Sequence, residues 1–254
     1  MQITLLQKPG RISVEEFNAS LQDAVNALKE ELSASVKLAG LSGRGWARVN
    51  IEGEDSEILQ EIIAKNLTVA RTNLSQMEIY GNYSGIVAKV GNGVEVDVGI
   101  EAPRPLLVTV SLNTLRAQLC DGKRLAEQEI AEHYCIRQES KLTVRITSLD
   151  PKAGTMEGWL ADLQMETYHE MITSGLDRIQ VFDCTRNRLE SALRKARLER
   201  DTLGIESSTL TAHSVPCKLG TDGVGLIPKL GSVLRKSELE LFLPKRIVTR
   251  CRQW

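Results

Sequence analysis

Hydrophobic positions near the start of the chain switch between the two-residue step of strands and the three- to four-residue step of helices. Phe17, Leu21, Val25, Leu28 and Leu32 recur at helical spacing and form one apolar face. The expected elements are strands at 2–6, 36–41, 46–51 and 77–80 and helices at 14–32 and 58–67. The order βαββαβ predicts a ferredoxin-like N-terminal domain over residues 1–79.

From residue 80 the pattern becomes predominantly β. Asn92-Gly93 separates two alternating runs, which is the strongest short signal for a hairpin. The expected strands lie at 85–90, 94–99, 106–110, 142–146 and 156–163, with helices at 111–119 and 124–134. Five short strands with a helical insertion after the third predict an OB-type β-barrel over residues 80–165.

The last third of the chain repeats the pattern of the first. We expect strands at 178–182, 203–211, 213–219 and 239–243 and helices at 185–196 and 226–234. This order predicts a second ferredoxin-like domain over residues 166–254, so the fold class is α+β. The basic tail 245–254 is expected to be loosely held.

Charge is distributed unevenly along the 254 residues. The 32 basic and 33 acidic side chains leave a net charge of −1, which removes any whole-protein attraction to polyanions. By segment, however, the net charge is −3 for 1–79, −4 for 80–176 and +6 for 177–254. The C-terminal domain therefore carries the basic excess.

Much of that excess lies in the helix expected at 185–196. Leu189 and Leu193 must face inward, so Arg186, Arg194 and Arg197 share the outer face. Lys195 adds a further charge to this helix. Two interpretations stay open: a solvated helix joined by Arg–Glu pairs, and a face that contacts phosphates and weakens with salt.

The barrel offers candidates for binding a single nucleic-acid strand, which needs a basic groove and aromatic rings for stacking. The candidates are Tyr83, Lys89, Arg116, Lys123, Arg124 and Arg145, with Tyr80 and Trp159 as further aromatic residues. An aromatic content of 4% and the acidic residues Glu95 and Asp97 argue against a strong groove.

A glycine-rich stretch, Gly220-Thr221-Asp222-Gly223-Val224-Gly225, precedes a helix. It could bind an anion or dock a nucleic-acid backbone through Lys218, Gly220, Thr221, Gly223, Gly225 and Lys229. It is neither a Walker A loop nor a dinucleotide fingerprint. The alternative is a tight turn in which Thr221 or Asp222 caps the helix.

No catalytic or metal-binding pattern stands out. The five cysteines contain no CxxC pair and predict reduced, mostly buried thiols, and the three histidines stand apart from one another. We therefore expect no enzyme activity, no cofactor and no metal. The N-terminus lacks a signal-peptide pattern and no apolar run reaches about 20 residues, which predicts a cytoplasmic protein that does not enter membranes.

The stretch HSVPCKLGTD at 213–222, followed by GLIPKLG at 225–231, resembles the C-terminal signature of an uncharacterised archaeal family of unknown function. Residues 175–181 with Thr185-Arg186, and residues 115–123, are similar to the same family, and the resemblance runs from Gly85 to Pro244. It implies an archaeal source, a central barrel of the kind found in RNA-binding proteins, and relatives in information processing. It implies no activity and no catalytic residue.

The leading hypothesis is a non-enzymatic factor that binds nucleic acid, RNA rather than DNA, or associates with ribonucleoprotein in archaeal translation or transcription. One alternative is a protein-interaction module, such as a homodimer pairing through sheet edges without nucleic acid. A less supported alternative is an enzyme that binds a phosphorylated small molecule in the glycine-rich loop.

Overall fold

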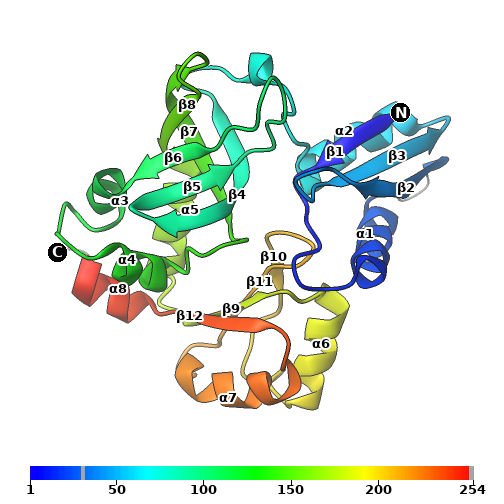
Figure 1. Ribbon diagram of the computed structural model, residues 1–254. Helices are drawn as coiled ribbons and strands as arrows, with labels where there is room; N and C mark the ends of the chain where they lie inside the picture. The colour runs from blue at the N-terminus through cyan, green and yellow to red at the C-terminus, as the bar shows by residue number, and fades with distance from the viewer. Residues whose placement is uncertain (30–31, 252–254) are drawn as a thin grey trace.

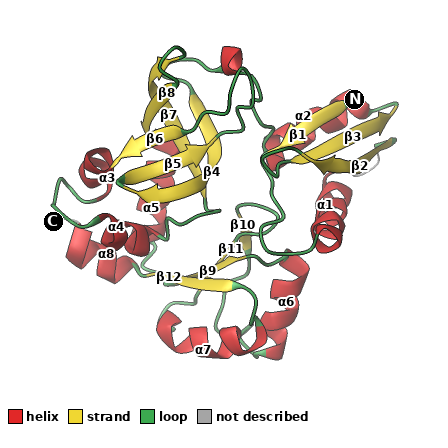
Figure 2. Ribbon diagram, in the orientation of Figure 1, coloured by secondary structure: helices red, strands yellow, loops and turns green. Residues whose placement is uncertain are grey.

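The computed structural model describes residues 1–29 and 32–251 and contains a closed barrel flanked by two sheet-and-helix units (Figures 1 and 2). The N-terminal unit lies beside the barrel, and the C-terminal unit lies below both in the view of Figure 1. The mixed α+β class predicted from the sequence is confirmed.

The N-terminal unit is a three-stranded antiparallel sheet in the order β1-β3-β2. Its elements are β1 (Gln2–Leu5), α1 (Val14–Lys29), β2 (Ala34–Leu41), β3 (Ala47–Gly53) and α2 (Ser56–Leu67). Helix α1 begins where Ser13 Oγ accepts a hydrogen bond from Glu16 N at 3.1 Å. It buries Phe17, Leu21 and Val25 of the predicted apolar face, and Leu32 lies beyond its range.

The prediction of a fourth strand at 77–80 is wrong. Residues Leu74–Gln76 form the short 3-10 helix η1, and the chain after it turns. Val69 instead makes a single antiparallel bridge with Leu5 at the edge of the sheet. Because this segment pairs over so few residues, the ferredoxin-like assignment of the N-terminal unit is not confirmed.

The closed five-stranded barrel is confirmed, with strand order β4-β5-β6-β8-β7. Its elements are β4 (Asn82–Gly91), β5 (Gly93–Asp97), β6 (Val108–Ser111), α3 (Leu112–Leu119), α4 (Glu127–Tyr134), β7 (Lys141–Asp150) and β8 (Thr155–Leu160). Alternate residues of β7 and β8 point into the core and out to solvent, as the period-two pattern requires. Strands β6 and β8 pair in parallel and the other neighbours pair antiparallel.

The C-terminal unit is a four-stranded antiparallel sheet in the order β10-β11-β9-β12. Its elements are β9 (Arg178–Phe182), α6 (Arg186–Lys195), β10 (Glu206–Ser207), β11 (His213–Pro216), α7 (Gly223–Val233) and β12 (Glu238–Phe242). Their order along the chain is the predicted one, and the ferredoxin-like assignment of this unit stays a prediction.

The strand expected at 203–211 shrinks to two residues. Thr209 Oγ1 accepts a hydrogen bond from Ala212 N at 2.9 Å, and Ser208 N donates to Ala212 O at 3.0 Å. These local bonds fold residues 208–212 into a turn and compete with strand pairing.

Two helices at the ends of the C-terminal unit belong to the core of the barrel. They are α5 (Asp162–Thr173) and α8 (Pro244–Cys251), which pack against each other. Tyr168 of α5 and Phe242 stack with ring centroids 6.4 Å apart, and Ile247 of α8 is buried in the same cluster. The prediction of a loosely held tail is therefore wrong for 245–251, and residues 252–254 lie outside the described part of the chain.

The predicted domain boundary at 165/166 falls inside α5. The division of the chain into three domains stays a prediction, but the barrel cluster extends beyond its proposed limits.

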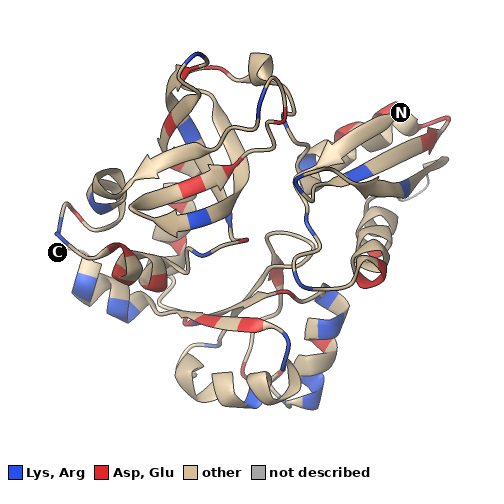
Figure 3. Ribbon diagram, viewed as in Figure 1, with Lys and Arg blue, Asp and Glu red and all other residues tan. Residues whose placement is uncertain are grey.

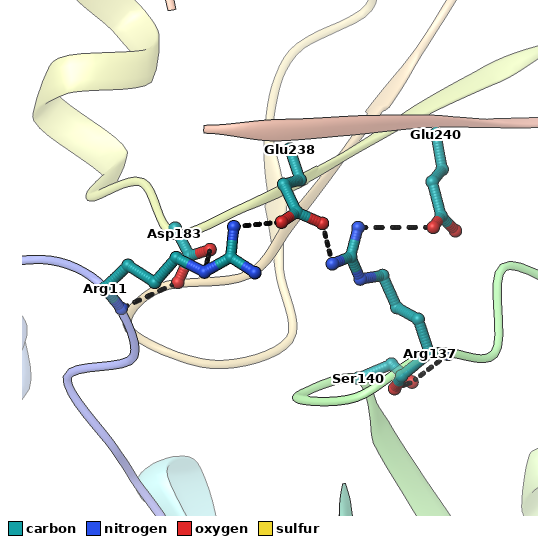
Figure 4. A network of polar contacts seen from close by, with 6 residues as sticks. All are labelled: Arg11, Arg137, Ser140, Asp183, Glu238 and Glu240. Carbon is teal, nitrogen blue, oxygen red and sulfur yellow. Dashed lines mark hydrogen bonds and ion pairs between the residues drawn. The ribbon is translucent and has the colours of Figure 1, made fainter. Parts of the chain in front are cut away.

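Ionic contacts hold the three units together. Arg11 of the N-terminal unit contacts Asp183 and Glu238 of the C-terminal unit, and Arg137 of the barrel contacts Glu238 and Glu240 (Figure 4). Glu238 is thus shared by two arginines from two other units. This cluster of five residues is called the arginine junction below.

Candidate nucleic-acid interface

Two aromatic rings stand exposed on the barrel unit. Tyr80 is 67% exposed and Trp159 is 53% exposed, whereas the other aromatic residues of 1–29 and 32–251 are buried or half-buried. Large exposed aromatic side chains are unusual in a chain with 4% aromatic residues, so their surroundings are informative.

Both aromatic residues are neighbours of Arg145. The Arg145 Nε donates to the carbonyl oxygen of Tyr80 at 3.2 Å, and Arg145 is the cross-strand partner of Trp159. Tyr80 N also donates to Ile146 O at 2.8 Å, which fixes its segment against the other edge of β7. Because neighbouring segments of a sheet lie about 4.8 Å apart, the three residues form a row across the barrel surface. We call them the Tyr80–Arg145–Trp159 row.

Among the described residues, the only carboxylate within 4 Å of this arginine is that of Asp162, with Nη1 and Oδ2 separated by 3.2 Å. The Asp162 side chain is 82% exposed, so water screens the pair. A phosphate can therefore compete for the Arg145 guanidinium at small cost.

Tyr83, the aromatic candidate favoured in the sequence, has a different role. Its hydroxyl accepts from Glu78 N at 2.8 Å and is within 3.4 Å of Gln76 O, so it holds the turn after η1. Its ring is half-buried against the barrel cluster. The neighbouring Tyr80 presents its ring instead.

The remaining barrel cations fall into two groups, those that brace the chain and those that are exposed. Arg116 Nε donates to Leu125 O at 2.9 Å, and Lys123 Nζ donates to Arg250 O at 3.3 Å, so both brace the chain around α3 and α8. Lys89 and Arg124 are exposed. The binding role of these four cations stays a prediction.

Helix α6 divides into a paired half and an unpaired half. Arg186 pairs with Glu190 at 3.1 Å, as the solvated-helix interpretation expects. Arg194, Lys195 and Arg197 are exposed at the other end, with no carboxylate within 4 Å among the residues that the structure describes. Figure 3 shows basic positions along this helix. Its C-terminal end therefore keeps the charge that the phosphate-binding interpretation requires.

In the glycine-rich loop, carboxylates already occupy the start of helix α7. Gly223 N donates to Asp177 Oδ2 and Val224 N donates to Asp222 Oδ1, both at 3.1 Å. Asp222 thus caps the helix, as the turn interpretation expects, and an anion at these amides would meet two negative charges. Gly220 has φ +85°, which suits its glycine, and Thr221 N closes the turn on Lys218 O. Gly225 and Lys229 are exposed on α7.

The same loop lines a cleft of about 420 Å³ that the sequence did not indicate. Lys218 of the loop lines this cleft together with Lys245 and Arg246 at the start of α8. The signal for α8 was the four-residue spacing of Leu243, Ile247 and Cys251, with basic residues between them.

Other chemistry is sparse. No cluster of metal-ligating side chains occurs in residues 1–29 and 32–251. All five cysteines are free and buried, and burial raises the pKa of Cys184 and of Cys217 to about 11. Within the same residues, no helix has the length and apolar character needed to cross a bilayer.

A domain of unknown function is similar to one unit of this chain. The DUF2110 C-terminal domain matches residues 176–242, which run from just before β9 to the end of β12. The match is shorter than the resemblance expected over 85–244 and covers the C-terminal unit alone. No curated protein matches the chain.

Similar solved structures share little sequence with the chain. An uncharacterised protein from Methanocaldococcus jannaschii has 11% identity and a TM-score of 0.24, over 34% of this chain and 96% of that one. The intact alpha subunit of aIF2 from Pyrococcus abyssi has 10% identity and a TM-score of 0.26, over 68% and 98%. A chain in the a/eIF2alpha–aDim2p–rRNA complex from Pyrococcus horikoshii OT3 has 12% identity and a TM-score of 0.27, over 48% and 64%. Scores of this size do not establish a common fold.

Proposed function

We propose that this protein binds single-stranded nucleic acid, RNA in preference to DNA, on the barrel face that carries the Tyr80–Arg145–Trp159 row. The observation that carries the proposal is that both exposed aromatic residues neighbour one arginine. Bases stack on aromatic faces with about 1–3 kcal/mol each, while the guanidinium contacts the phosphate between them.

The barrel supports this role by its topology. In chain order its strands are first, second, third, fifth and fourth around the closed sheet, with helices between the third and fourth. We assign this arrangement to the OB type, a barrel that binds single-stranded nucleic acid on one face of its curved sheet. The unpaired end of α6 adds a basic surface that favours polyanions.

The cellular setting is part of the proposal. The family resemblance favours an archaeal, cytoplasmic protein that works on RNA or within a ribonucleoprotein in translation or transcription. A homodimer or a protein partner without nucleic acid is the alternative, and a complex that survives nuclease treatment would favour it.

Fluorescence anisotropy with a labelled oligouridylate at low salt tests the proposal. Tyr80→Ala and Trp159→Ala should each weaken binding about tenfold, because each removes one stacking surface. Leu163→Ala is the matched control, since Leu163 is also large, apolar and exposed but lies outside the row.

Two results would contradict the proposal. One is the absence of oligouridylate binding by the wild type at low salt. The other is an equal affinity for Trp159→Ala and Leu163→Ala. A DNA oligonucleotide of the same length decides the RNA preference.

A further inference from the structure

A serine and a histidine meet across the short hairpin of the C-terminal unit. Ser207 of β10 is the cross-strand partner of His213 of β11, and Ser207 Oγ lies 2.9 Å from His213 Nδ1. On the other side of the ring, His213 Nε2 lies 2.9 Å from the carbonyl oxygen of Cys184. A carbonyl oxygen can only accept, so Nε2 carries the hydrogen and Nδ1 accepts from the Ser207 hydroxyl.

The imidazole is held in its basic form. His213 is 2% exposed, and burial lowers its pKa to about 4, so the ring is neutral at neutral pH. The carbonyl of Cys184 fixes both the ring orientation and the tautomer. A neutral ring whose free nitrogen faces a hydroxyl is the arrangement that a general base needs.

The hydroxyl opens into a pocket between the N-terminal and C-terminal units. The pocket has a volume of about 300 Å³, and Ala24, Ala27 and Leu67 form part of its wall. Arg186 also lines it, with Nη1 3.4 Å from Ser207 Oγ. A reacting group bonded to that oxygen would therefore lie next to a positive charge.

We propose that Ser207 is a nucleophile toward carboxylic esters with small apolar acyl groups, with His213 as its general base. This activity goes beyond the proposed binding of nucleic acid. Arg186 stabilises the oxyanion, and the Cys184 carbonyl positions the base. The alanine and leucine wall receives the acyl group.

The step balances within the pocket and its substrate. Ser207 Oγ attacks the ester carbonyl carbon, and its proton moves to His213 Nδ1. The tetrahedral intermediate then loses the alcohol, which takes the proton from Nδ1 as the carbon–oxygen bond breaks. Water, activated by the same nitrogen, hydrolyses the acyl-serine and releases the acid.

A fluorophosphonate probe tests the nucleophile directly. The serine oxygen forms a bond to phosphorus, the phosphorus–fluorine bond breaks, and fluoride leaves. Intact-mass spectrometry of the folded wild type should show one adduct, which peptide mapping places on Ser207. Ser207→Ala should lose it, and Ser208→Ala should keep it, because Ser208 Oγ instead donates to Ala212 O at 3.0 Å.

The rate of the reaction with the fluorophosphonate probe tests His213 as the general base. His213→Gln, shown to be folded by its melting temperature, should react about 100-fold more slowly than the wild type. If that variant does not fold, the comparison of Ser207→Ala with Ser208→Ala decides alone.

The proposal is overturned by an unlabelled wild type, by an adduct on another residue, or by equal labelling of a heat-unfolded sample. A folded His213→Gln that reacts at the wild-type rate overturns it as well. Oligouridylate affinity should be the same for Ser207→Ala and wild type, so the failure of one proposal is distinguishable from the failure of the other.

Discussion

At the scale of single residues, His213 couples stability to pH. Burial lowers its pKa to about 4 from an ordinary value of 6.5, so the unfolded chain binds more protons between these two values. The contribution of His213 to the free energy of unfolding should therefore be fully present above pH 6.5. It should fall as the pH drops toward 4, by up to about 3 kcal/mol. Chemical denaturation from pH 4.5 to 7.5 measures the slope, and His213→Gln should flatten it. An unchanged slope in that variant would contradict the assignment.

Asp97 is the second residue with a sharp consequence. Its side chain is 2% exposed at the end of β5. Its Oδ2 forms ion pairs with two cations of the N-terminal unit, Lys8 Nζ at 3.4 Å and Arg44 Nη2 at 2.8 Å. Burial lowers the pKa of Lys8 even with this partner present, so the ammonium depends on the carboxylate.

Asp97→Ala removes the partner of two partly buried cations and should destabilise the protein by about 3–5 kcal/mol. The matched control is Glu52→Ala, which breaks an exposed pair with Lys37 and should cost less than about 1 kcal/mol. Urea unfolding midpoints compare the two variants. Similar midpoints would mean that the Asp97 contacts do not join the units.

At the scale of elements, helix α6 provides a test of electrostatics. Arg194→Glu with Arg197→Glu reverses two exposed cations that lack carboxylate partners among the described residues. If this end contacts phosphates, affinity for oligouridylate should fall, and the slope of log affinity against log salt should drop by about one per lost contact. Lys37→Glu with Lys65→Glu makes the same charge change on the N-terminal unit and should leave the slope intact. Equal slopes for both double variants would confine binding to the barrel.

The sequence predicted elements well where spacing alone decides them. The alternation around Asn92-Gly93 and the four-residue steps from Phe17 correspond to the observed hairpin and helix. Helix α8 was missed because its charges suggested a solvated tail, although Leu243, Ile247 and Cys251 carried the helical step. The Tyr80–Arg145–Trp159 row and the Ser207–His213 pair depend on which strands become neighbours. Local pattern does not encode that register, so Tyr83 was favoured over Tyr80.

At the scale of the whole molecule, the arginine junction sets how the barrel and the C-terminal unit are held. Arg137 contacts Glu238 and Glu240 and lies 4.9 Å from the Phe182 ring centroid. Burial and the adjacent Asp183 raise the pKa of Glu139 on the same barrel loop. Both effects disfavour the charged form of Glu139 beside Asp183.

Arg137→Ala should loosen this contact, because one side chain supplies all three interactions. Hydrogen exchange should become faster at 135–140 and 238–242 and stay unchanged in β4 and β5. Arg235→Ala is the control, since Arg235 is exposed and its Nε donates to Ser232 O within its own turn at 3.4 Å. Identical exchange in the two variants would show that the junction is not needed to hold the units together.

Helices α5 and α8 pack against each other, and both contribute to the barrel core. The chain therefore leaves the barrel at the end of α5 and returns to it at the neighbouring start of α8. The stretch between them contains the C-terminal unit, and its limits nearly coincide with the 176–242 match. Deleting this stretch and joining α5 to α8 with a few glycines would leave every strand of the barrel in place. Evolution can likewise acquire, exchange or discard such a module in one recombination event, without rethreading the rest of the chain.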